Sequence, residues 1–394
     1  MTIKKESILK IISLILMFYP FLDIFIAYIN NNEGVLTFHI FVLSLFIVLF
    51  CLQKYLFKEK HKKTHFLVGG GFVLLVLVTS IHENLVGDNL DGFSFLIKMY
   101  LFLAVLYYYK ETGFYDVFAS FLLSHKMHWL LVNIGTFVTL AISLQHSGRI
   151  AHWGTTVISG PYSLAHTLSY VFLFLMFGNL FFYFSNRKML WLIAALSSLA
   201  IVILTGVRTA LLAVLFFAFV YMKNKGIKGF MFGGIALALI FIGLYSLGIF
   251  DPIIQKTEYA AAVSGSASNG RILIWVTSIA AYINPPRGSS FLSYLLGIGE
   301  SALCQYNWNH IGIRIQAHND FITILVSYGL INVVAYITML IKKMPSYDSL
   351  LTLSALIIFN GFITYGQSII LFPLLIILVE DIRHNNLNVF NKHC

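Results

Sequence analysis

Three polar residues in a row, His318, Asn319 and Asp320, stand directly before an apolar run in the stretch IQAHNDFITILVSYGLIN, residues 315–332. Asparagine or aspartate at such a boundary caps the following helix by accepting hydrogen bonds from its first free amides. Capping explains one of these two residues but not the histidine. An imidazole held beside a rigid helix, with a pKa near neutrality, can accept the proton of an attacking hydroxyl. The spacing therefore indicates His318 as a candidate general base.

Arginine is concentrated in segments that we predict to be external. Five of the six external basic residues are arginine, although the chain has only seven arginines among its 26 basic residues. The six are Arg149, Arg208, Lys256, Arg271, Arg287 and Arg314. A guanidinium is a planar fork that binds phosphate through two hydrogen bonds, whereas lysine is a point charge. The bias predicts an external phosphate site; the alternatives are chance in a small sample and contacts with lipid headgroups.

Two of these arginines stand in short, defined settings. Arg208 ends the joint TGVR between two apolar runs, where it either faces a cavity and binds a lipid-linked phosphate or reaches the outer headgroups. Arg149 and Gly160 bracket the loop RIAHWGTTVISG, which contains His152 and Trp153. We expect either a loop that closes on a sugar or a phosphate, or an ordinary polar loop.

Other kinds of site have little support. The histidines lack close zinc-ligand spacing, so no metal site is predicted, and there is no P-loop, GxSxG or CxxC motif. The three cysteines are far apart and imply no disulfide framework. Asp23 and Lys98 fall inside apolar runs, where we expect them to pair with each other or, as the alternative, to serve a transport pathway.

The elements that must position these residues are membrane helices. The chain of 394 residues is 59% hydrophobic and only 11% charged, and apolar runs long enough to cross a bilayer recur along it. We predict an all-α, polytopic membrane protein with a single transmembrane domain over 1–394 and about twelve spans. The predicted spans are 8–29, 35–57, 65–81, 92–109, 127–145, 162–184, 189–205, 207–222, 230–249, 319–341, 349–364 and 367–382.

The distribution of lysine and arginine orients these spans. Nineteen basic residues fall on one face, six fall on the other, and Lys98 lies within a span. The richer face is predicted to be cytoplasmic, with both termini on it. The net charge of +10 therefore reflects lysine-rich cytoplasmic loops and does not indicate nucleic acid. No small-residue cleavage pattern follows the first apolar run, which is predicted to be a retained span.

Two external segments are long, 146–161 and 250–318. Within the second, RILIWVTSIAAYI (271–283) predicts a short helix that begins at Arg271 and ends before the prolines of NPPRGSS. It is too short to cross the bilayer, so we expect it to lie along the outer interface. A surface helix beside a large external loop indicates a substrate that is itself a lipid.

The order of these motifs resembles the O-antigen polymerase and O-antigen ligase superfamily of bacterial envelope polysaccharide assembly. The motifs are the loop that begins at Arg149, LTGVRTALL at a short external joint, and then NGRILIW, LLGIG and AHNDFITILVSYGLIN in the large loop. They lie within about 150–340, whereas the early spans carry no matching motif.

The resemblance implies a metal-independent glycosyltransferase without cofactors in the bacterial inner membrane, its active site on the external face. The donor would be an undecaprenyl-pyrophosphate-linked glycan, and the acceptor a lipid-linked repeat unit or a lipid A core. His318 would be the general base, Arg208 and Arg271 would hold the pyrophosphate, and Arg149 would bind donor or acceptor. Arg314, four residues before His318, could help to bind phosphate. A chain-length regulator and a flippase are possible partners.

Three functions remain open from the sequence. A polymerase of lipid-linked repeat units is the first interpretation. An O-antigen ligase, which transfers the finished polymer to a lipid A core sugar, uses the same donor and is not separated by these residues. A polysaccharide flippase or other transporter would need charged or glycine-broken spans near the midplane. Asp23, Lys98 and the run Gly69-Gly70-Gly71 are the features of this kind, and polarity is otherwise concentrated in the external segments.

Overall fold

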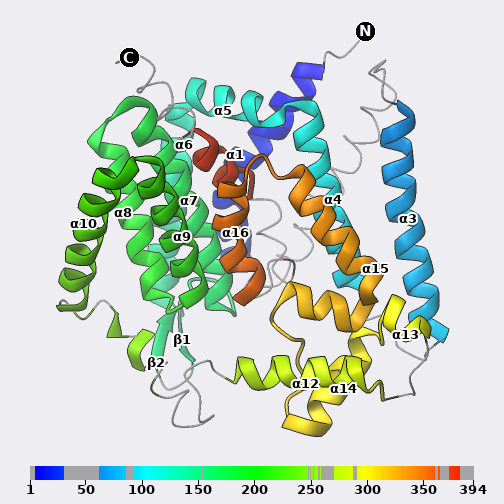
Figure 1. Cartoon of the computed structure of the whole chain (residues 1–394). Helices are drawn as coiled ribbons and strands as arrows, with labels where there is room; N and C mark the ends of the chain where they lie inside the picture. Colours follow the sequence, from blue (N-terminus) through cyan, green and yellow to red (C-terminus); the bar gives the residue numbers. More distant parts are fainter. Residues whose placement is uncertain are drawn as a thin grey trace.

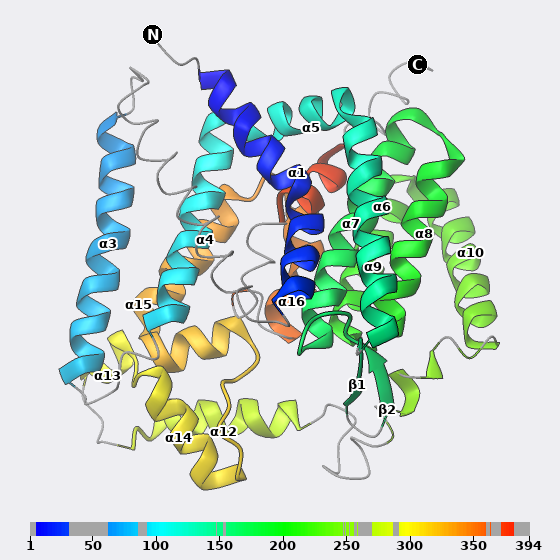
Figure 2. The ribbon, with the colours of Figure 1, turned by 180° about the vertical axis from the view of Figure 1, so that it is seen from behind.

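Helices make up almost all of the computed structural model (Figures 1 and 2). The structure describes residues 5–30, 62–85, 93–146, 148–152, 155–246, 248, 250–251, 253–255, 258, 270–286, 291–359, 363 and 372–381. The longer elements are α1 (Lys5–Ile29), α3 (Lys62–Leu85), α4 (Phe93–Thr112), α6 (Lys126–His146), α7 (Ala165–Asn186), α8 (Met189–Leu204), α9 (Arg208–Asn224), α10 (Gly226–Ser246), α15 (Asp320–Lys343) and α16 (Tyr347–Phe359). The shorter elements are α5 (Phe114–Ser124), α12 (Arg271–Ile283), α13 (Phe291–Leu296), α14 (Glu300–Ile311) and the strands β1 (Arg149–His152) and β2 (Thr155–Ile158).

The longer helices run between two ends of different character. One end carries β1, β2, α12, α13 and α14, and we call it the hairpin end (bottom of Figure 1). At the opposite end lie the α7–α8, α9–α10 and α15–α16 turns with their basic residues, and we call it the lysine end. The separation agrees with the charge pattern of the sequence. That the lysine end faces the cytoplasm stays a prediction.

Membrane-spanning character is supported by length and composition. Within the described ranges, α1, α6, α7 and α15 are long and apolar enough to cross a bilayer, and shorter apolar helices accompany them. An all-α membrane protein is thus confirmed in outline, and the count of twelve spans remains a prediction. The predicted span 35–57 lies outside the described residues.

Helix α7 lies at the centre of the core because it is apolar on every side. Its buried residues include Tyr170, Phe174 and Phe177 among many others. Asn179 is one of its buried polar residues: its Oδ1 accepts a hydrogen bond from Trp129 Nε1 at 2.9 Å, and its Nδ2 donates to Asn133 Oδ1 at 2.7 Å. These bonds satisfy buried polar groups and join α6 to α7.

The segment 146–161, predicted to be external, contains the two paired strands β1 and β2 and is thus more regular than the loop that we expected. β1 and β2 pair antiparallel, with Arg149 opposite Ile158. The amides of Ser159 and Gly160 both donate to the carbonyl of Gly148, at 3.0 and 3.1 Å, and close the base of the hairpin. Arg149 is therefore held at that base.

The expected pair between Asp23 and Lys98 is not formed, so that prediction is wrong. Asp23, buried in α1, accepts hydrogen bonds from Tyr19 at 3.2 Å and from Tyr162 at 2.6 Å. Lys98 in α4 lies within electrostatic range of Glu300 at the start of α14. Nearby phenols and a carboxylate in the external loop, which the sequence could not place, satisfy both charges.

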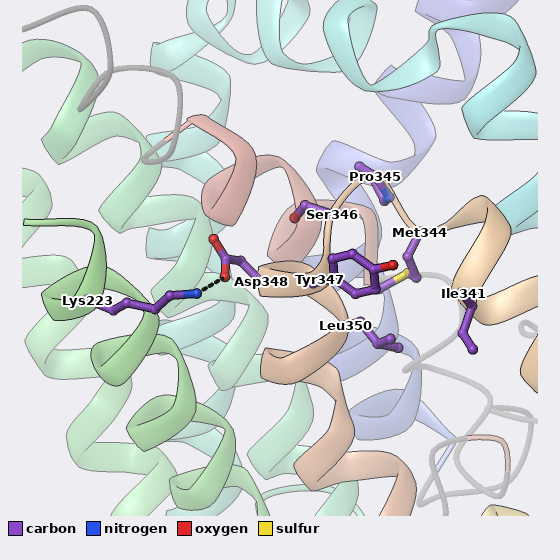
Figure 3. Close-up of a pocket in the computed structure, with 8 residues that line it drawn as sticks. All are labelled: Lys223, Ile341, Met344, Pro345, Ser346, Tyr347, Asp348 and Leu350. Atoms are coloured by element: carbon purple, nitrogen blue, oxygen red, sulfur yellow. Dashed lines mark hydrogen bonds and ion pairs between the residues drawn. The ribbon is translucent and has the colours of Figure 1, made fainter.

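A pocket of about 450 Å³ lies at the lysine end, between the last turns of α9 and α15 and the start of α16 (Figure 3). Its lining includes Lys223, Met344, Tyr347 and Asp348. The other end of α16 reaches the hairpin end, where the ring of Phe359 lies 6.2 Å from that of Trp275 in α12. The pocket is thus remote from the external segments that carry the candidate catalytic residues.

Candidate active site

Helix α15 is broken at Gly329, whose φ of 81° and ψ of 179° are not helical. Figure 1 shows two orange segments that meet at an angle, one crosswise near the hairpin end and one that runs towards the lysine end. The predicted continuous span 319–341 is therefore wrong in this respect. The break places the start of α15, and with it His318, inside the molecule instead of at the tip of an upright helix.

The motif LLGIG supplies hydrogen-bond donors to the carbonyls that the break in α15 leaves free. The amide of Ile298 donates to the carbonyl of Val326 at 2.9 Å, and the amide of Gly299 donates to the carbonyl of Ser327 at 3.0 Å. The next carbonyl, that of Tyr328, accepts from the side-chain amide of Asn332 at 2.6 Å. Backbone groups freed by a helix break inside a membrane protein need such partners.

Two glycines make this contact possible. A Cβ on Gly297 would overlap the backbone of Ser327 and Tyr328, and a Cβ on Gly329 would overlap the backbone of Leu295. Both glycines also have a positive φ, 85° and 81°, which residues with a side chain rarely adopt. The LLGIG motif therefore has a structural role: it fixes the crosswise half of α15.

Gly297→Ala should lower the thermal stability of the detergent-purified protein strongly. The left-handed backbone alone costs alanine about 1–2 kcal/mol, and the overlap with the α15 backbone adds to that cost. Gly113→Ala is the control because Gly113 has a similar φ of 68° and open space around its Cβ position. Equal losses in the two variants, measured as midpoints of thermal unfolding, would show that the close approach has no energetic weight.

His318 lies on the loop between α14 and α15 in a strained conformation. Its φ is 52°, in the left-handed region, and only one other non-glycine residue in the described part of the chain, Arg187, shares this property. The next residue, Asn319, is the N-cap of α15, and its Oδ1 accepts from the amide of Ile322 at 3.1 Å. The capping prediction is confirmed for Asn319. Strain of this kind marks a backbone held by its surroundings and is frequent at functional sites.

Side chains from α12 and α14 hold this loop. Asn307 donates to the carbonyl of Ile315 at 2.8 Å and to the hydroxyl of Ser278 at 3.2 Å. Gln316 donates to the carboxylate of Glu300. The loop before His318 is therefore fixed to two helices of the large external segment, which pre-orders the imidazole.

Arg271 lies within electrostatic range of His318. Arg271 is the first residue of α12, as predicted, and follows Gly270 with its φ of 72°. Burial and, second, the charge of Arg271 lower the pKa of His318 to about 4. The expected pKa near neutrality is thus wrong, because the sequence did not reveal a half-buried imidazole beside a guanidinium. At pH 7 the imidazole is neutral and can accept a proton, and an anion bound at Arg271 would raise its pKa.

Asp320 has a role that the sequence did not indicate. It is fully buried, and its Oδ2 accepts from the hydroxyl of Tyr336 at 3.5 Å and from the amide of Ile363 at 3.4 Å. Tyr336 belongs to the other half of the broken helix, so the carboxylate ties the two halves together across the break. A buried acid in the first turn also suits the positive end of the helix dipole.

The remaining candidate residues are more dispersed. Arg208 begins α9, directly after the turn at Gly206, and is half-buried. Arg149 and Arg314 are exposed, and no contact between described residues joins either of them to His318. Arg287 lies outside the described residues. Among these candidate arginines, Arg271 is therefore the one whose charge acts on His318.

Comparison with known proteins gives one match. Residues 192–337 match the family model described as O-Antigen ligase, which confirms the resemblance inferred from the motifs. The matched segment contains Arg208, Arg271, His318 and both glycines of the α15 break, and it excludes Arg149. No curated protein and no solved structure matches the chain.

Proposed function

We propose that this chain, which the match over 192–337 assigns to the O-antigen polymerase and ligase superfamily, polymerises undecaprenyl-pyrophosphate-linked repeat units on the outer face of the bacterial inner membrane. Members of the family are membrane glycosyltransferase-like enzymes that act on lipid-linked glycans. The observation that carries the proposal is the half-buried His318, held at a φ of 52° and within electrostatic range of Arg271 at the start of α12. A cation for the leaving group and a neutral base for the acceptor are the two groups that such a transfer needs.

In the proposed step, a hydroxyl of the acceptor sugar attacks the anomeric carbon of the donor sugar. A glycosidic C–O bond forms, and the bond from the anomeric carbon to pyrophosphate oxygen breaks with its electron pair on the oxygen. The hydroxyl proton passes to the neutral imidazole of His318, and undecaprenyl pyrophosphate leaves. A single displacement of this kind inverts the configuration at the sugar.

Guanidinium groups stabilise the charge that develops on the leaving pyrophosphate. We assign this role to Arg271, which lies within electrostatic range of His318, and to Arg208 at the start of α9, as the sequence motifs imply. Arg149 and Arg314 bind the glycan or pyrophosphate further out. Because arginine forks provide the countercharge, the mechanism requires no metal ion.

The surface of α12 supports an approach of the donor from the lipid. Its outward face is apolar and exposed, with Ile272, Leu273 and Val276 all more than half exposed. The opposite face, which includes Ile274 and Ser278, is buried. An amphipathic helix of this kind lies in the membrane interface. The polyprenyl tail then reaches Arg271, at the first turn of α12, without leaving the bilayer.

A ligase is the second candidate, because the matching family model is described as O-Antigen ligase. Both activities use the same donor and the same leaving group, so the Arg271–His318 arrangement serves either. They differ in the acceptor: a second lipid-linked repeat unit for the polymerase, a lipid A core sugar for the ligase.

The test is reconstitution of the purified chain in liposomes with undecaprenyl-pyrophosphate-linked repeat units, with a chelator and without added metal. We expect longer lipid-linked chains on a gel. In a parallel reaction with lipid A core, glycosylated core in place of longer chains would identify a ligase. If neither product forms and the substrate crosses the bilayer intact, the chain is a transporter and the proposal is wrong.

A further inference from the structure

Two cations lie near each other on a shared aromatic surface at the lysine end. The guanidinium of Arg187 lies 5.9 Å from the ring centroid of Tyr183 and 5.5 Å from that of Phe184. The ammonium of Lys225 lies 5.5 Å from the ring centroid of Tyr221, which in turn is 5.3 Å from that of Phe184. The C-terminal ends of α7 and α9 thus form one aromatic platform that carries both charges.

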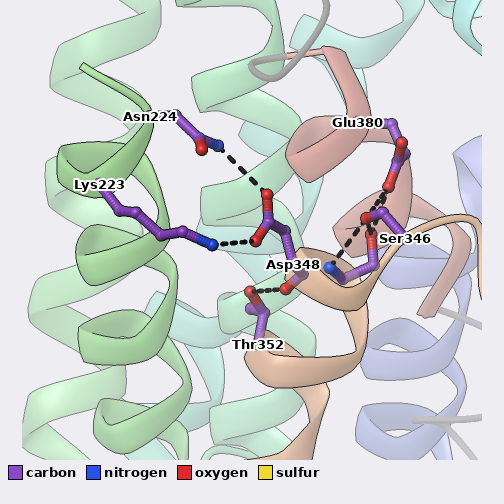
Figure 4. Close-up of polar contacts among 7 residues, drawn as sticks. Lys223, Asn224, Ser346, Asp348, Thr352 and Glu380 are labelled. Carbon is purple, nitrogen blue, oxygen red and sulfur yellow. Dashed lines mark hydrogen bonds and ion pairs between the residues drawn. The ribbon is translucent and has the colours of Figure 1, made fainter. Parts of the chain in front are cut away.

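These two charges lack a carboxylate partner within the described part of the chain, unlike Lys223 and Lys343 at the same end of the molecule. Lys223 pairs with Asp348 at 3.3 Å (Figure 4), and Lys343 pairs with Glu111 at 2.6 Å. Burial and, second, the charge of Arg187 lower the pKa of Lys225. Two like charges held together in this way favour a bound anion.

Arginine is an unfavourable residue for the backbone conformation at position 187, which ends α7. Arg187 is the C-cap of α7 with a φ of 56°, and its amide donates to the carbonyl of Tyr183 at 2.7 Å. Glycine is the preferred residue at a left-handed helix cap, because it has no Cβ. An arginine at this position costs backbone strain, and its guanidinium lies over the aromatic platform. Capping of the helix therefore does not explain why this residue is an arginine.

Large exposed apolar side chains stand within two residues of each cation in the sequence. Ile227 is 82% exposed between Lys225 and Lys228, and Met189 is 60% exposed at the start of α8. The outward faces of α8 and α10 continue this apolar surface, which in a membrane protein contacts lipid chains. A basic site bordered by lipid-facing residues fits a ligand with a phosphate and acyl chains better than a free phosphate.

We propose that Arg187 and Lys225 bind the phosphodiester of an anionic phospholipid in the leaflet at the lysine end. The bound headgroup bridges the ends of α7 and α9, whose far ends lead to the hairpin and to Arg208. The site is separate from the proposed glycosyltransferase site and does not depend on it.

Arg187→Gly gives a sharp test, because glycine relieves the backbone strain while it removes the charge. We expect the purified variant in neutral detergent to unfold at the same temperature as the wild type or higher. Added phosphatidylglycerol should raise the unfolding temperature of the wild type much more than phosphatidylcholine does. In the variant the apparent affinity for phosphatidylglycerol should fall about fivefold, and by more in Arg187→Gly/Lys225→Gln, as expected when basic residues near an anionic lipid are removed.

The control is Lys110→Gln/Lys126→Gln, which removes two exposed basic residues elsewhere at the lysine end and should keep the full lipid response. Native mass spectrometry of the wild type should show retained phosphatidylglycerol, which gives a readout that does not depend on any variant. An unchanged lipid response in Arg187→Gly would overturn the proposal. Equal protection by inorganic phosphate alone would also overturn it, because the site would then bind a soluble anion.

Discussion

Lysine in place of Arg271 should reduce glycan transfer by about 100-fold or more, the usual effect of removing one donor that stabilises transition-state charge. Lysine keeps the positive charge beside His318, so the imidazole should stay neutral at pH 7. What it removes is the planar fork that binds two pyrophosphate oxygens at once. The loss should appear in kcat, measured with saturating lipid-linked donor, because the leaving-group charge grows in the transition state.

Two further variants show whether this loss is specific to the proposed pyrophosphate site. Arg208→Lys should show a loss of the same kind, because we propose that both arginines hold the leaving group. Lys126→Arg makes the reverse exchange at an exposed residue of the lysine end and should leave transfer unchanged. Full activity in both Arg271→Lys and Arg208→Lys would refute the arginine clamp, whatever the structure of the site.

The elements with strong local signals were predictable from the sequence. Arg271–Ile283 is a helix with the predicted bounds, because a glycine precedes it, prolines follow it and its apolar residues recur at helical spacing. Helix α14 was not predicted within the same external segment. Its sequence, ESALCQYNWNHI, has no long apolar stripe, and Asn307 on its buried face donates to Ser278 of α12 and to the carbonyl of Ile315 in the loop before His318.

The break in α15 depends on contacts between distant segments and could not be read locally. A glycine inside an apolar run is compatible with a continuous helix at a small cost. Gly329 is non-helical here because LLGIG approaches the α15 backbone and takes over the carbonyls of Val326 and Ser327. The sequence identified LLGIG as a motif but not as the partner of Gly329, since neither glycine indicates the other.

In the candidate site, too, the sequence predicted which residues take part but not their surroundings in the fold. Residue types and order selected Arg271 and His318, and the fold places them within electrostatic range of each other. The depth of His318 in the fold is a tertiary property, and it lowers the pKa that an exposed histidine would have. Arg149 and Arg314 were selected by the same arginine bias but lie exposed, and the sequence held no signal that would rank them below Arg271.

His318→Ala should abolish transfer while leaving the lipid-linked donor bound, because alanine removes the base and keeps the arginines. General-base catalysis contributes about 100- to 10,000-fold to a rate, so the transfer rate of the variant should be lower than that of the wild type by a factor in that range. His310→Ala is the matched control: His310 is exposed on α14, stacks on Tyr306 at 3.9 Å and is not part of the proposed site. Donor binding, measured with a labelled lipid-linked repeat unit, separates a lost base from a collapsed site. Unchanged transfer in His318→Ala would rule out the base assignment.

The pH dependence of the wild type distinguishes a base from a residue that only shapes the loop. In the proposed mechanism the neutral imidazole is the active form, so activity should be lost as the pH falls through the pKa of His318. In the free enzyme that pKa is about 4, and kcat/KM for the donor should therefore decline only near that pH. Bound pyrophosphate offsets the charge of Arg271 and raises the pKa, so the acid limb of kcat should lie at a higher pH than that of kcat/KM. A residue that only positions the loop would give no such separation, and two limbs at the same pH would remove the proposed link between leaving-group binding and base strength.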